Sequence, residues 1–174
     1  SHAHGDHYDP VIFNLGSEAA ATHYIFGWDA GDDPGHHELI GPRASLELDG
    51  VRVFTVNSSP DGIPEVAFMV EVEGFWIYHN GDHYTAGTDD LDYLATLTPR
   101  VDLAFLPGVA RFRDTWVEKG ILFLERFHPS VVFPMHLGGR EGEADAWLRI
   151  LRDVGLTPTT LIPGHRGDRF EVGR

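Results

Sequence analysis

Cysteine is absent from the 174-residue chain, and basic residues are scarce. Without cysteine the protein has no disulfide, no thiolate metal ligand and no cysteine nucleophile, so any metal must be held by histidine and carboxylate side chains. Only 13 lysines and arginines stand against 27 acidic residues, which gives a formal net charge of −14. A field of that sign repels nucleic-acid phosphates and anionic membranes, so we expect neither as a partner.

Long hydrophobic runs are also absent. No apolar stretch approaches the roughly 20 residues that span a bilayer, and the N-terminus does not read as a signal peptide. We therefore expect a soluble protein, with the cytoplasm slightly favoured as its location. Hydrophobic residues make up 42% of the chain and nothing marks a domain boundary, so the sequence predicts a single domain over residues 1–174.

After the N-terminal segment, most of the chain shows two successive patterns of apolar residues. From Arg43 to His79, alternating apolar residues and two turn signals predict an antiparallel meander of four strands. After Asp82, apolar periodicities predict helices and strands in alternation. The predicted strands are 44–48, 51–56, 66–72, 75–79, 101–106, 131–135 and 160–162, and the predicted helices are 89–97, 116–127 and 144–154. This order is typical of an α/β (α+β) sandwich with helices outside a central sheet.

Residues with metal-binding chemistry gather at the extreme N-terminus. Positions 1–7 read Ser-His-Ala-His-Gly-Asp-His, and Gly5 allows a tight loop that would bring the side chains together. Neutral imidazoles and carboxylates are the usual ligands of zinc and similar divalent ions. A purification tag or a histidine-rich tail is the alternative interpretation, but tags do not interleave Asp and Gly in this order. The segment predicts a metal site that includes His2, His4, Asp6 and His7.

The spacing His-x-His-x-Asp-His resembles the signature of the metallo-β-lactamase superfamily. Two later motifs follow in the order found in that family: Tyr-His-Asn-Gly-Asp at 78–82 resembles its strand-end Gly-Asp, and Pro-Met-His at 134–136 resembles its late histidine. The resemblance spans nearly the whole chain, and the flanking segments are most similar to the branch that contains sugar-lactone hydrolases. It implies a four-layer αββα sandwich, present here without its first strands.

The resemblance also implies a ligand set and a reaction. It assigns six ligands, with His2 and His4 on a first metal, Asp6, His7 and His136 on a second, and Asp82 on both. The implied cofactors are two divalent ions, zinc first, with manganese or iron as alternatives. The implied reaction is hydrolysis by a metal-bound hydroxide that Asp6 orients, acting on an ester, a lactone or a related bond of a small-molecule substrate. The alternatives are an iron-bound oxidoreductase of the same fold and a degenerate, non-catalytic metal-binding protein.

Two features depart from the family pattern. The family has a further histidine, the third ligand of the first metal, on a strand end before the bridging aspartate, whereas residues 56–62 contain none. Asp61 is a candidate replacement, and a plain polar turn beside a weak or empty first site is the alternative. The strands that precede the signature in the family are missing as well. We therefore expect a native N-terminal segment or a partner chain to cover the sheet. A homo-oligomer is one form that such a partner could take.

Five other polar residues are candidates for the surroundings of the metals. His79 and His83 flank the Gly-Asp motif and would orient a ligand or face the substrate. His165 lies in a glycine-rich loop and would bind substrate, although exposed loop histidines commonly have no such role. Arg111 and Arg113 would hold a substrate carboxylate or phosphate, with plain solvent exposure as the alternative.

Overall fold

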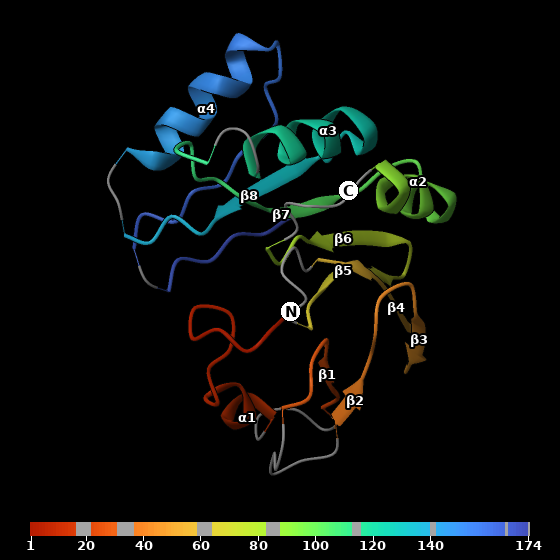
Figure 1. The fold of residues 1–174 in the computed structure, drawn as a ribbon. Coiled ribbons are helices and arrows are strands. Elements are labelled where there is room, and N and C mark those ends of the chain that lie inside the picture. The colour runs from red at the N-terminus through yellow and green to blue at the C-terminus, as the bar shows by residue number, and fades with distance from the viewer. Residues whose placement is uncertain are drawn as a thin grey trace.

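A six-stranded sheet lies at the centre of the protein (Figure 1). The structure is a computed structural model that describes residues 1–16, 22–30, 37–58, 64–82, 88–112, 116–139, 142–165 and 167–173. The strand order is β3-β4-β5-β6-β7-β8. Their bounds are β3 Ser45–Leu48, β4 Val51–Asn57, β5 Val66–Val72, β6 Phe75–His79, β7 Leu103–Pro107 and β8 Val131–Met135. β3 to β6 form an antiparallel meander, whereas β6, β7 and β8 are parallel.

Three helices cover one face of this sheet: α2 Thr88–Leu97, α3 Glu118–Phe127 and α4 Glu143–Asp153 (Figure 1). Each turns one apolar stripe inward, because residues three or four apart lie on the same side of a helix. The buried side chains of these stripes are Leu91, Leu94, Phe123, Phe127, Trp147 and Leu151. None of the described helices has the length and hydropathy that crossing a bilayer requires.

The strand directions bring several chain segments to one edge of the sheet. α2 connects β6 to β7 and α3 connects β7 to β8, and such helical crossovers keep the strands parallel. The carboxyl ends of β6 and β8 therefore point to the same edge. β5 runs antiparallel to β6, with Phe68 opposite His79, so the beginning of β5 lies at this edge too. The loops after β6 and β8 and the residue before β5 consequently come close together.

The opposite face of the sheet carries apolar side chains that are only half-buried, among them Phe68, Phe105 and Phe133. Phe170, from the C-terminal segment, packs against Phe133 with ring centroids 5.3 Å apart. This face also borders the cleft described below, because Phe68 and Phe105 belong to its lining.

The N-terminal part of the chain adds a short helix and a second, smaller sheet, neither of which the sequence patterns predicted. α1 spans Ile12–Leu15, and β1 Tyr24–Phe26 pairs in parallel with β2 His37–Leu39. Aromatic contacts hold this part together: the ring centroids of Phe13 and Tyr24 lie 4.8 Å apart, and those of Tyr8 and Trp28 lie 5.0 Å apart.

The predicted α/β class and the three predicted helices are confirmed. All predicted strands except the last are confirmed as well, including the four strands of the meander. The predicted strand 160–162 is wrong. Thr159 and Leu161 each make one backbone hydrogen bond with Val132, and Thr160 forms only an isolated bridge. Pro158 and Pro163 bracket this segment, and proline cannot donate to a strand ladder, so the pairing stops after one residue.

Candidate metal centre

All six residues of the expected ligand set lie at the edge of the sheet where β6 and β8 end. Asp82 follows β6 by three residues, and His136 follows β8 directly. The N-terminal segment folds into a tight turn, in which the amides of His7 and Tyr8 both donate to the carbonyl of His4. The carbonyl of Ser1 accepts a hydrogen bond from the amide of Val66, at the start of β5, which holds this turn against the edge of the sheet.

One group of ligating atoms comes from His2, His4 and Asp82. Nε2 of His2 lies 2.8 Å from Nδ1 of His4 and 3.6 Å from Oδ2 of Asp82. The His2 side chain is almost completely buried, whereas His4 is exposed.

A second group comes from Asp6, His7 and His136, with Asp82 beside it. The Nε2 atoms of His7 and His136 face each other at 2.5 Å, and Oδ1 of Asp82 lies 3.2 Å from the first and 2.8 Å from the second. Oδ2 of Asp6 lies 4.0 Å from Nε2 of His136. Asp82 thus offers one carboxylate oxygen to each group.

The donor atoms suit divalent cations. Two pairs of imidazole nitrogens face each other at short range, and a neutral imidazole offers a ring nitrogen whose lone pair can bind a cation. Oδ1 of Asp82 is buried without a well-formed hydrogen bond, although two imidazole nitrogens lie beside it. Histidine nitrogens with carboxylate oxygens are a donor set typical of zinc, manganese and iron sites.

Electrostatics favour a neutral His2 and an ionised Asp82, the protonation states that metal ligands need, whereas His136 is held in its protonated form more strongly. Burial and, to a smaller extent, the neighbouring His7 lower the pKa of His2 to about 4, so this imidazole is neutral near pH 7. Burial alone would raise the pKa of Asp82, but His136 and His7 outweigh it and hold the pKa well below its usual range. In return, the contact with Asp82 raises the pKa of His136 against the opposing effect of burial.

Comparisons with known proteins identify the fold around this centre. No family model matches the chain. A UPF0173 metal-dependent hydrolase of Pyrococcus furiosus is 30% identical over 146 residues, which cover 78% of this chain and 64% of that protein, so the chain spans just under two thirds of this curated relative. A metallo hydrolase of Ignicoccus hospitalis has a solved structure that matches with a TM-score of 0.66 and 20% identity, covering 93% of this chain and 73% of that one. The metallo-β-lactamase fold protein YhfI of Bacillus subtilis matches with a TM-score of 0.63 and 10% identity, covering 94% and 72%. This chain is a metallo-β-lactamase-fold protein.

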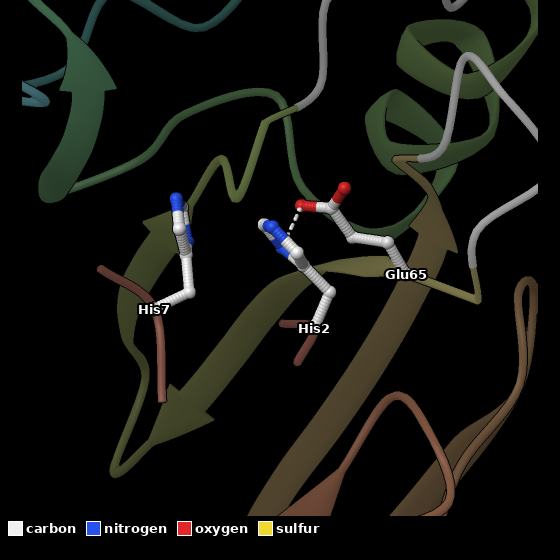
Figure 2. A group of neighbouring side chains, drawn as sticks. All are labelled: His2, His7 and Glu65. Carbon is white, nitrogen blue, oxygen red and sulfur yellow. Dashed lines mark ion pairs between the residues drawn. The ribbon is translucent and has the colours of Figure 1, made fainter. Parts of the chain in front are cut away.

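Two residues of the centre of this metallo-β-lactamase-fold protein were not predicted from the sequence. Glu65 is buried, and its Oε1 lies 2.9 Å from Nδ1 of His2 (Figure 2). The Ser1 hydroxyl lies 3.0 Å from Nδ1 of His7. A single glutamate after a proline is not part of any recognisable motif. Only the pairing of β5 with β6 shows that Glu65, the residue before β5, lies beside the Gly-Asp loop.

The end of β4, where the family pattern has its further histidine, carries Asn57 and Ser58 instead. Ser58 is fully buried, and its hydroxyl donates to the carbonyl of Asn80. Within the described ranges, the group around His2 and His4 therefore has Asp82 as its third member and no third imidazole. The candidate replacement Asp61 lies outside the described residues, as do His83 and Arg113.

The other candidate histidines differ in their placement. His79 lines the cleft beside the metal centre, its Nδ1 accepts a hydrogen bond from the amide of Gly81, and burial lowers its pKa to about 4. His165 is exposed, and its amide donates to Asp168. It is not among the described side chains that line the cleft. His79 therefore remains a proposed residue of the surroundings of the metal centre. The placement of His165 does not support a role in substrate binding.

Metal binding is expected to release a proton and to strengthen as pH rises. His136 must lose its proton to coordinate an ion, and its raised pKa means that it keeps this proton to a higher pH than an ordinary histidine. Calorimetric titration with Zn²⁺ in two buffers of different ionisation enthalpy measures the protons released. We expect the affinity to increase as the pH rises through the raised pKa of His136 and then to level off. His165→Ala, which changes an exposed histidine outside the cleft, should leave this profile unchanged; an affinity independent of pH in the wild type would contradict the assignment of His136.

Proposed function

We propose that the protein is a metal-dependent hydrolase with a centre for two divalent ions, held by His2, His4, Asp6, His7, Asp82 and His136. The observation that carries this proposal is the position of Asp82, whose two oxygens face two separate groups of imidazole nitrogens. A carboxylate between two such groups is the arrangement that a bridging ligand requires. The similarity to metal-dependent hydrolases supports the proposed reaction class.

Bound divalent ions would lower the pKa of water at this centre and polarise the substrate oxygen that they contact. The protein's own contribution is to position the groups around that water. Asp6 is the most exposed carboxylate of the set, with 66% of its side chain accessible, and it borders the cleft. We assign it the role of orienting the attacking water, accepting its proton at Oδ2 and passing that proton to the leaving group.

The cleft beside the centre favours a small substrate with an apolar body. Its volume is about 1120 Å³, and Phe68, Phe105, Phe112 and Trp116 line it together with His136. The ring of Trp116 packs on that of His136 with centroids 4.7 Å apart, so a substrate that reaches the centre contacts this indole. The lining also holds polar and charged side chains, among them Asp6, His7 and His79. Aromatic walls combined with polar groups at defined positions are typical of sites for small organic molecules.

One cation, Arg111, also lines the described part of the cleft. Its guanidinium makes an ion pair of 3.0 Å with Glu143 and packs over the ring of Phe112. Because Glu143 pairs with this charge, Arg111 contributes little to holding an anionic group such as a phosphodiester. We therefore propose an ester or lactone as the substrate class.

Elemental analysis and a hydrolase screen test the proposal on the full-length protein, purified without chelators or a histidine tag. We expect two divalent ions per chain and hydrolysis of aryl esters or lactones that chelation abolishes and Zn²⁺ restores. One ion or none would contradict the two-ion centre. Iron together with visible absorption would favour an oxidoreductase, and activity on phosphodiesters alone would overturn the substrate class.

A further inference from the structure

We propose that Glu65 is a positioning residue that fixes the ring of His2 and the backbone of Asp82 as one unit of the metal centre. This inference rests on the proposed function, since it assigns His2 and Asp82 as ligands. Glu65 lies outside the sequence motifs that supply the proposed metal ligands.

Glu65 is buried in the first position before β5, with only 3% of its side chain exposed. Oε1 lies 2.9 Å from Nδ1 of His2, and the same oxygen accepts a hydrogen bond of 2.6 Å from the amide of Asp82. A single oxygen therefore joins the N-terminal loop to the loop after β6. These two loops are far apart in the sequence, so their relative placement depends on contacts of this kind.

The contact selects one tautomer of His2. When Nδ1–H donates to the carboxylate of Glu65, the lone pair of the ring is at Nε2, which is the atom near His4 and Asp82. Histidines that ligate metals usually donate their second ring N–H to a carboxylate or carbonyl, which fixes the ring and increases its basicity. Glu65 occupies that place for His2.

Gly81 makes room for this carboxylate. A Cβ atom at position 81 would lie 2.6 Å from Oε1 of Glu65 and 2.9 Å from Oγ of Ser58, closer than side chains tolerate. The backbone of Gly81 also has a positive φ of 57°, which favours glycine. The glycine of the Gly-Asp motif is thus explained here by the approach of Glu65 to the Asp82 amide.

Glu65 could instead be a ligand itself, because it lies within reach of His2 and His7 (Figure 2). The geometry favours positioning: Glu65 contacts Nδ1 of His2, whereas the other ligands gather at Nε2. Glutamine distinguishes the two roles. Its carbonyl oxygen can accept from both the His2 ring and the Asp82 amide, but it replaces a carboxylate ligand poorly.

The experiment compares Glu65→Gln, Glu65→Ala and the wild type in the full-length protein by calorimetric titration with Zn²⁺ and by the visible spectrum of the Co²⁺ form. Loss of a partner behind a metal ligand typically costs about 10–100-fold in affinity, and we expect this loss at one of the two ions in Glu65→Ala. Glu65→Gln should recover most of the loss and give a Co²⁺ spectrum close to that of the wild type. Glu71→Gln is the matched control, because Glu71 is a buried carboxylate of β5, the strand that Glu65 precedes, and it pairs with Arg52.

Gly81→Ala provides a second test. If its methyl group displaces the Glu65 carboxylate, the losses in affinity for Gly81→Ala and Glu65→Ala should not add in the double variant. Additive losses, unchanged affinity in Glu65→Ala, or a Gln variant as impaired as the Ala variant would each overturn the positioning role. A different result would contradict the proposed function: a wild-type protein that binds no divalent ion.

Discussion

Asp82→Ala is expected to remove hydrolytic activity and to weaken the binding of both metal ions by more than about 100-fold. Even the loss of a residue that only hydrogen-bonds to a metal ligand lowers metal affinity by about 10–100-fold. The reason is that Oδ2 lies beside the first group of imidazoles and Oδ1 beside the second. The substitution also leaves His7 and His136 facing each other without an intervening anion. Metal content after gel filtration and hydrolysis of the best substrate from the screen would be measured together.

A matched control separates this effect from the loss of a buried charge. Asp90 is also buried, and it pairs with Arg43 on the helix-covered side of the sheet. Asp90→Asn is expected to keep two ions per chain and wild-type turnover. If Asp82→Ala keeps one ion tightly bound, Asp82 belongs to one group alone and the centre is not bridged; if it keeps both ions and the activity, the proposed centre is wrong.

The N-terminal ligands were predicted from the sequence itself, whereas Asp82 and His136 were assigned as ligands through their resemblance to motifs of the metallo-β-lactamase superfamily. The first four occur within one short loop, and Asp82 and His136 follow strands whose apolar runs are clear. Parallel strands joined by helices direct their carboxyl ends to one edge, so the convergence follows from element order.

Glu65 could not be predicted in the same way. Its proximity to Asp82 depends on the register of β5 against β6, where Phe68 pairs with His79. Register is fixed by packing and turn geometry across the whole hairpin, and a shift of one residue would turn Glu65 to the other face of the sheet. The strand at 160–162 was wrong for a related reason, since apolar residues alone do not show that prolines limit the ladder.

The metal centre also depends on the core beneath it, through β6. Tyr78 lies in this strand four residues before Asp82, is fully buried, and stacks on Phe123 of α3 with ring centroids 4.1 Å apart. Phe123 in turn packs on Phe127 with centroids 4.7 Å apart. This aromatic stack fixes the helix against the strand that leads to the Gly-Asp loop.

Phe123→Ala is expected to lower the free energy of unfolding by about 3–5 kcal/mol, because it removes a buried ring and leaves a cavity between α3 and the sheet. Leu122→Ala is the control: Leu122 is the preceding residue of the same helix and is 38% exposed, so its loss should cost about 0.5 kcal/mol or less. Urea unfolding of the full-length protein measures both, with a chelator present because bound metal would add its own binding energy to the folded state. A lower midpoint with an unchanged slope for Phe123→Ala locates the loss in the folded core. Equal midpoints for the two variants would mean that α3 does not pack on β6 as the structure has it, and the position of Asp82 would then need another support.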